Sequence, residues 1–123
     1  MLKLTYCVRR RSDRSREAFD DSWRDDHGPL VAKHAETLGI ERYVQVPALE
    51  EPALQEGIRS TRNARPLAFD GVAELWFESV DAMRSAQRTD DGAAAARALY
   101  EDERRFIDLE ASMLWYGTER EIV

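Results

Sequence analysis

His27 is the residue of this sequence best suited to move a proton, because an unperturbed imidazole titrates near neutral pH. It stands in the segment Trp23-Arg24-Asp25-Asp26-His27-Gly28-Pro29, where the proline interrupts a helical pattern. A histidine beside such an interruption can point into a cavity instead of along a solvated helix face. Two interpretations stay open from the residues alone: a general acid or base, or a histidine that caps the helix or completes the core.

Glu74 is the second candidate for acid–base chemistry, since it lies in the middle of an otherwise apolar segment beside Trp76. A carboxyl group that faces a closed cavity has a raised pKa and can serve as an acid or a base. The alternative is an ion pair with Arg42 or another arginine across a sheet. In a strand, Glu74 and Trp76 share one face, and we expect His27 to face a cavity with Glu74 or an aromatic wall within reach.

Aromatic residues on the predicted elements suit an apolar binding site. They fit the packing of a core and a dimer contact, and they also fit the wall of a pocket for a small cyclic or aromatic ligand. Both interpretations can hold at once. The residues we expect to contact such a ligand are Trp23, Tyr6, Tyr43 and Trp76.

Metal and nucleophile chemistry have little support in the sequence. The two histidines, His27 and His34, lack the His-x-x-x-His and His-Glu-x-x-His spacings, and a carboxylate such as Glu74 would have to supply a third ligand. We therefore expect no metal site. The single cysteine, Cys7, falls within a predicted strand and is expected to be buried and inert. The chain has no glycine-rich phosphate loop and no Gly-x-Ser-x-Gly elbow.

The strands that must position these residues follow from alternating hydrophobicity. A period of two predicts four of them, at Leu2–Val8, Ile40–Pro47, Gly71–Glu78 and Met113–Thr118. The segment Ala48–Asp70 has little periodicity and is expected to be a long connection with at most a short helical turn.

Helical spacing and capping residues predict the helices. One begins after Ser15 and is expected to break or kink at His27-Gly28-Pro29, because proline lacks an N–H and crowds the preceding turn. A second runs from Ser79 through Gln87. A third runs from Asp90 or Asp91 to about Asp108, with an exposed face made of Glu101, Asp102, Glu103 and Arg104.

The order of elements is strand–helix–strand, repeated once, which predicts a ferredoxin-like β-α-β β-α-β fold of the α+β class with a four-stranded antiparallel sheet. We expect a single domain over residues 1–123. Helices can cover one face of such a sheet, yet both faces carry large apolar side chains, as Phe77 and Trp76 illustrate. The uncovered face predicts a homodimer, sheet against sheet, that forms a dimeric α/β barrel.

Composition narrows the classes of partner. The chain has 123 residues, 43% of them hydrophobic and 34% charged, and a net charge of −6, which argues against a general nucleic-acid binder. No apolar run approaches the roughly 20 residues that span a bilayer, and no signal peptide is visible at the first residues. We expect a cytoplasmic protein with no membrane and no nucleic-acid partner.

Several segments in order along the chain resemble the EthD family of the dimeric α+β barrel superfamily. The most distinctive is Trp23-Arg24-x-x-His27-Gly28-Pro29-Leu30-Val31. The other matching segments are Leu2–Arg9, Arg42–Gln45, Asp70–Phe77 and Asp102-Glu103-x-x-Phe106-Ile107-Asp108. Residues 48–65 match no motif of the family.

The resemblance implies a homodimeric barrel, with a pocket between each sheet and its own helices or within the barrel, and no organic cofactor. The name-giving member belongs to a bacterial ether-degradation system alongside a cytochrome P450. Similar proteins act on aromatic polyketides by dehydration or decarboxylation, and a related barrel isomerises a methylated muconolactone. The family is often labelled oxidoreductase. His27 carries over as the acid–base candidate, and Trp23, Glu74 and Trp76 as pocket candidates.

Three functions are therefore compatible with the sequence. The first is a cofactor-free enzyme of small-molecule catabolism or secondary metabolism, in which His27 transfers a proton beside a carbonyl or lactone of a hydrophobic substrate. The second is a non-catalytic ligand-binding or auxiliary protein of an oxygenase system that degrades ethers or xenobiotics. The third is cofactor-free oxygenation that begins with substrate deprotonation by His27.

Overall fold

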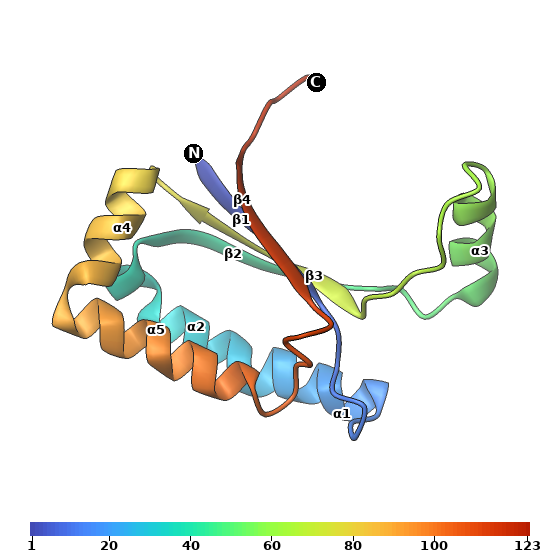
Figure 1. Ribbon diagram of the computed structural model, residues 1–123, viewed down its shortest axis with the longest axis horizontal. Helices are drawn as coiled ribbons and strands as arrows, with labels where there is room; N and C mark the ends of the chain where they lie inside the picture. Colours follow the sequence, from blue (N-terminus) through green and yellow to red (C-terminus); the bar gives the residue numbers. More distant parts are fainter.

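A four-stranded antiparallel sheet forms the centre of the structure, a computed structural model that describes residues 1–123 (Figure 1). Its strands are β1 (Leu2–Val8), β2 (Ile40–Pro47), β3 (Gly71–Phe77) and β4 (Met113–Thr118), in the order β2-β3-β1-β4. This order and the helices between the strands confirm the predicted ferredoxin-like α+β fold. The predicted strand boundaries hold, except that β3 ends one residue earlier than expected.

Six helical segments connect the strands, and three of them begin with a capping side chain, from Ser15, Ser79 or Thr89. They are α1 (Arg16–Asp21), η1 (Ser22–His27), α2 (Gly28–Leu38), α3 (Pro52–Ser60), α4 (Val80–Arg88) and α5 (Asp90–Glu103). The Ser15 and Ser79 hydroxyls accept hydrogen bonds from the backbone N–H groups of Ala18 and Ala82, each at 3.0 Å. Gly39 ends α2 in the left-handed conformation, with φ of 71°. No helix is long and apolar enough to cross a membrane.

The chain does not break at His27-Gly28-Pro29, because helical structure continues from Arg16 to Leu38, but the α-helical pattern is interrupted just before Gly28. The irregularity is a π turn, η1, in which the Gly28 N–H donates to the Trp23 carbonyl five residues earlier. A π turn is wider than an α turn. It therefore leaves room for the Pro29 ring, which would otherwise crowd the carbonyl four residues before it.

The core lies between the sheet and the helix layer below it in Figure 1. The register pairs Tyr6 with Ala73 and Leu4 with Leu75, so these side chains share the face that the helices cover. Phe19 packs against Trp23 and Phe106, with ring centroids 5.4 and 5.7 Å apart. The buried cluster consists of Leu2, Tyr6, Val8, Phe19, Trp23, Ala73, Leu75, Phe77, Met83, Phe106 and Ile107.

The opposite face of the sheet carries none of the helices α1, α2, α4 and α5 (Figure 1). The register places Thr5, Glu74, Val44 and Trp115 side by side on this open face. Trp115 is 51% exposed, so a large apolar group faces outwards, as the sequence predicts.

The connection between β2 and β3 holds more structure than expected. It contains the nine-residue helix α3, which stands apart from the rest of the molecule beyond the ends of β2 and β3 (Figure 1). None of its residues is buried, and Leu54 and Ile58 are exposed.

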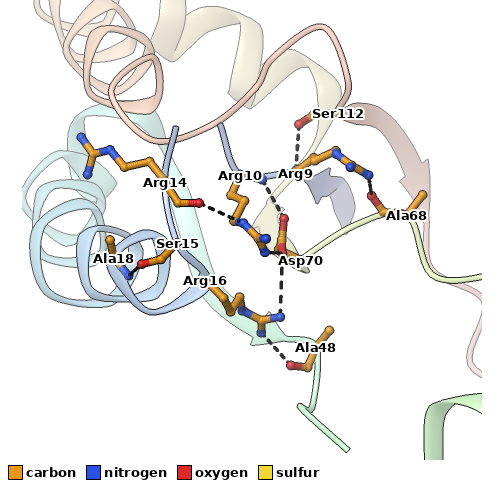
Figure 2. A network of polar contacts seen from close by, with 10 residues as sticks. All are labelled: Arg9, Arg10, Arg14, Ser15, Arg16, Ala18, Ala48, Ala68, Asp70 and Ser112. Carbon is orange, nitrogen blue, oxygen red and sulfur yellow. Dashed lines mark hydrogen bonds and ion pairs between the residues drawn. The ribbon is translucent and has the colours of Figure 1, made fainter. Parts of the chain in front are cut away.

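Asp70 joins the loops at one end of the sheet (Figure 2). Its carboxylate accepts hydrogen bonds from the backbone N–H and the guanidinium of Arg10, at 2.7 and 3.0 Å, and lies 3.8 Å from the guanidinium of Arg16. Arg16 in turn donates to the carbonyl of Ala48, and Arg9 donates to that of Ala68. These arginines hold the loops together at this end of the sheet.

Candidate functional site

A cavity of about 200 Å³ lies between the sheet and its covering helices. Of its 20 lining residues, 17 are hydrophobic, and the exceptions are His27, Gln87 and Glu103. Leu114 and Tyr116 of β4 and Tyr100 of α5 belong to the lining and are each about half exposed. The cavity therefore opens to solvent at the edge of the sheet, between β4 and α5.

His27 is buried and is oriented by an acidic partner from the far end of the chain. Its Nδ1 lies 2.8 Å from Oδ2 of Asp102, whose other oxygen accepts a hydrogen bond from Arg105 at 2.8 Å. Burial opposes ionisation of Asp102, but the hydrogen bonds from Arg105 and His27 hold its pKa below the usual value. An ionised carboxylate only accepts hydrogen bonds, so the proton of a neutral His27 lies on Nδ1.

The electrostatics keep His27 in its neutral form near pH 7. Burial lowers the pKa of His27 below its ordinary value, Asp102 opposes this shift, and the positive charge of Arg105 adds to it. The Nε2 atom then carries a free lone pair. Every fully buried side-chain nitrogen in the structure has a hydrogen-bond partner. Nε2 of His27 has no such partner, so it is not fully buried, and it is accessible from the cavity that His27 lines.

The π turn positions this imidazole. Trp23 and His27, four residues apart at the two sides of the turn, both point inwards and are both buried. The ring of Phe106 packs edge-on against His27, with centroids 5.4 Å apart. The orientation of the base thus depends on η1, on the segment after α5 and on Asp102.

Glu103 is the second titratable group in the cavity, next to Tyr6. Burial raises the pKa of Glu103 to about 7, although a hydrogen bond with Tyr6 opposes the shift. Burial and Glu103 together raise the pKa of Tyr6, which stays protonated. Glu103 has no basic partner, whereas Asp102 has two.

The expectation that Asp102 and Glu103 lie on the exposed face of the last helix is wrong. Asp102 reaches His27, and Glu103 lines the cavity with Leu99. The spacing carries the signal for this placement, because Glu103 follows Leu99 by four residues and therefore shares its side of α5.

Three of the four residues expected to contact a ligand line the cavity: Trp23, Tyr6 and Tyr43. Gln45 fixes two of them, since its Nε2 donates to the Trp23 carbonyl at 2.8 Å and to the Tyr43 hydroxyl at 3.0 Å. Burial raises the pKa of Tyr43, which is therefore neutral.

Glu74 and Trp76 do not lie within reach of His27, so the expectation that Glu74 reaches this histidine is wrong. Both side chains lie on the open face, because Ala73, Leu75 and Phe77 take the cavity side of β3. The Glu74 carboxylate forms an ion pair with Lys3 at 3.1 Å, not with an arginine. Trp76 is buried between two cations, with Lys3 Nζ and the Arg42 guanidinium carbon 4.7 and 4.6 Å from its ring centroid.

The remaining candidates lie outside the cavity. Cys7 is only partly buried and shares the open face with Val72, to which it is paired across the strands. No three histidine, cysteine or carboxylate side chains lie close enough together to hold a metal ion.

The family model described as an EthD domain matches residues 11–110. This match confirms the resemblance drawn from the sequence motifs. Among curated proteins, none matches the chain.

Solved structures share the fold at low sequence identity. A protein of the EthD family from Bacillus halodurans is 19% identical, with a TM-score of 0.62 over 98% of this chain and 100% of its own. SnoaB, a cofactor-independent oxygenase from Streptomyces nogalater, is 15% identical, with a TM-score of 0.57 over 99% and 95% of the two chains. A dimeric ferredoxin-like protein from Thermobifida fusca is 10% identical, with a TM-score of 0.59 over 96% and 90%.

Proposed function

The chain belongs to the EthD family, and from this premise we propose that it is a cofactor-free enzyme that transfers a proton on a small hydrophobic carbonyl compound. Isomerisation, dehydration and decarboxylation all begin or end with such a transfer. The observation that carries the proposal is the accessible Nε2 of a buried, neutral His27 whose Nδ1 is held by Asp102.

The geometry suits His27 to the role of general base. Nε2 removes a proton from the carbon next to the carbonyl group, and the ionised Asp102 stabilises the imidazolium that forms. A positioned general base contributes about 10²–10⁴-fold to the rate. The apolar lining adds to this by excluding water, which strengthens electrostatic interactions in the cavity.

The size and lining of the cavity define the class of ligand. An apolar cavity of roughly 150 Å³ holds benzene, and drug-sized ligands occupy pockets of roughly 300–1,000 Å³. A cavity of about 200 Å³ with 17 hydrophobic lining residues therefore suits a neutral molecule of one or two rings. A charged ligand would lose hydration there without meeting a free ionised partner.

Hydrogen exchange on a neutral bicyclic ketone, 1-tetralone, tests the proposal. We expect the protein to bind 1-tetralone and to speed the exchange of its α-hydrogens with D₂O, followed by NMR. The variant His27→Gln should bind the ketone with similar affinity and lose most of the acceleration. The matched control is His34→Gln, because His34 is the other histidine and does not line the cavity.

The same experiment distinguishes proton transfer from the alternative functions. Binding with no exchange in any variant would overturn proton transfer and favour a ligand-binding auxiliary protein, a role that the almost wholly apolar lining also suits. Failure to bind 1-tetralone would overturn the ligand class. Consumption of dioxygen in step with the loss of ketone would assign the deprotonation to cofactor-free oxygenation.

We also propose that the protein is a homodimer whose two open sheet faces meet. The dimeric ferredoxin-like neighbours support this arrangement, as do the exposed Met113 and Trp115 on the open face. In that dimer each cavity would stay on the outer, helix-covered side of its own sheet.

A further inference from the structure

Glu103 is a partly buried acid that the proposed proton abstraction does not use. It extends from α5 into the cavity, one residue after the Asp102 that holds His27, and it lines the same space as His27. The Tyr6 hydroxyl on β1 lines the cavity with it, and no lysine, arginine or histidine pairs with it. A carboxyl group without a cation in an apolar cavity favours its neutral form.

We propose that Glu103 is a second catalytic residue, a neutral carboxylic acid that donates a hydrogen bond and then a proton to the carbonyl oxygen of the substrate. This inference rests on the proposed function and deepens it. Both groups line one cavity of about 200 Å³, so a ligand of one or two rings bound there can touch both.

The two groups together perform a balanced reaction. His27 Nε2 takes the proton from the α-carbon, and the electron pair of that C–H bond forms a carbon–carbon double bond. The carbonyl π electrons move to oxygen, which receives the proton of Glu103 and becomes an enol hydroxyl. In a substrate with a double bond between its β- and γ-carbons, the hydroxyl proton then returns to Glu103 and the carbonyl group forms again. The double bond moves to the α- and β-carbons while the γ-carbon takes the proton from His27, which completes an isomerisation without an oxidant or reductant.

The substrate class is therefore a neutral, unsaturated carbonyl compound that forms an enol. An acid is more useful here than an ionised carboxylate, because a negative charge would repel the developing enolate oxygen.

The surroundings of Glu103 support the neutral acid near pH 7. Besides burial, the negative charge of Asp102 raises the pKa of Glu103, and the hydrogen bond of Tyr6 lowers it. The titratable groups that share the cavity with it are His27 from η1, Tyr6 from β1, Tyr43 from β2, Tyr100 from α5 and Tyr116 from β4. None of them carries a positive charge while His27 is neutral.

The infrared carbonyl band of bound 1-tetralone tests this hydrogen bond without relying on turnover. We expect the band to lie at lower frequency in the parent protein than in Glu103→Leu, which fills the space but cannot donate. Glu103→Gln should keep part of the shift and lose at least tenfold in exchange rate, because an amide donates a hydrogen bond but transfers no proton. The matched control is Glu101→Leu on the same helix, whose carboxylate is exposed and pairs with Arg104.

The pH profile supplies the second readout. The exchange rate of the parent should fall as pH rises through about 7, since Glu103 then loses its proton, and this limb should vanish in Glu103→Gln. An unchanged carbonyl band in Glu103→Leu would overturn the inference even if His27 proves to be the base. A second outcome combines a band shift that is lost in Glu103→Leu with an exchange rate that is unchanged in His27→Gln. This outcome would support the contact between Glu103 and the ketone and would overturn the proposed function.

Discussion

Two side chains in one cavity have pKa values that move in opposite directions. Burial lowers the pKa of His27 and raises that of Glu103, because in each case it penalises the charged form. Between the lowered pKa of His27 and the pKa of Glu103 at about 7, the cavity therefore holds a neutral base and a neutral acid instead of an ion pair. Such a separation of environments assigns acid and base roles within a site.

Replacing Asp102 should lower the pKa of His27 further. In Asp102→Asn the negative charge that favours the imidazolium is lost, and an amide oxygen accepts a weaker hydrogen bond than a carboxylate, while burial and the charge of Arg105 remain. NMR titration of the imidazole carbon and nitrogen shifts measures this change. Asp25→Asn is the control, because Asp25 pairs with Arg24 and not with His27. A pKa that stays the same or rises in Asp102→Asn would contradict the assigned partnership.

Replacing Glu103 should change how stability depends on pH. The pKa of Glu103 is about 7 in the folded protein against an ordinary value of 4.5. Its contribution to stability is present below pH 4.5 and is lost as pH rises to about 7, because the unfolded chain gives up the proton more easily. At about 1.4 kcal/mol per pKa unit, Glu103→Gln should gain up to about 3 kcal/mol over the parent between pH 4.5 and 7.5.

Denaturant unfolding of both proteins at several pH values measures this gain. The comparison removes the effect of His27, which both proteins share and which acts in the opposite direction, adding stability as pH rises towards 6.5. A gain that does not vary with pH would show that Glu103 has an ordinary pKa.

Of the acid–base groups His27, Asp102 and Glu103, the sequence alone predicts the first and misses the other two. His27 stands out because imidazole chemistry and the nearby proline mark it locally. Asp102 lies 75 residues away from it, and that contact depends on how α5 packs against η1. Glu103 sits in a charged run, which is typical of a solvated face, although its spacing from Leu99 places it on the inner side of the helix.

At the scale of elements, the π turn depends on tertiary contacts that the local sequence does not reveal. Pro29 marks an irregularity, but whether the chain breaks or widens depends on tertiary contacts. The Trp23 carbonyl accepts from both the Gly28 N–H and the Gln45 side chain, at 2.8 Å in the second case. A residue on β2 thus helps to satisfy the backbone of the wide turn, and no pattern within residues 15–38 reveals it.

Gly71 should be intolerant of a side chain because β3 begins against the Trp23 indole. A Cβ at this position would lie 2.9 Å from two indole carbons and 2.8 Å from the Val46 carbonyl oxygen. The indole is 1% exposed and cannot move away. Gly71→Ala should therefore cost about 1–3 kcal/mol of the free energy of unfolding, as overpacking typically does.

Chemical denaturation measures that cost, and Gly57→Ala is its control. Gly57 lies within α3, and a Cβ there would have no neighbouring atom within 4 Å. Alanine at this position should therefore stabilise α3 by about 0.5–1 kcal/mol. Equal effects of the two substitutions would contradict the close packing of β3 on η1.

At the scale of the whole molecule, the two faces of the sheet separate two tasks. Side chains of alternate residues line the cavity on one face, as Leu75 does, and form the open face on the other, as Glu74 and Trp76 do. The period of two correctly groups Glu74 with Trp76. It does not reveal whether Glu74 and Trp76 or their neighbours Ala73, Leu75 and Phe77 face the helices. This is why the fold is predictable from the sequence while the contribution of β3 to the cavity is not.

The open face makes the oligomeric state testable with one substitution. Trp115 of the edge strand β4 is 51% exposed and lies beside Thr5 on the open face, which also holds the apolar side chains of Cys7, Val44, Val72 and Met113. A stable interface buries roughly 800 Å² per partner, and a charge placed within it is left without water or a partner. We therefore expect Trp115→Glu to convert a dimer into a monomer of 14.2 kDa.

Sedimentation velocity over a concentration series measures this change. Val80→Glu is the control, because Val80 is an exposed apolar residue at the start of α4, where a negative charge suits the helix dipole. The monomeric variant should still bind 1-tetralone, since the cavity lies on the other side of the sheet and no open-face side chain lines it. A parent protein that sediments as a monomer at high concentration, or a Trp115→Glu variant that stays dimeric, would refute the face-to-face arrangement.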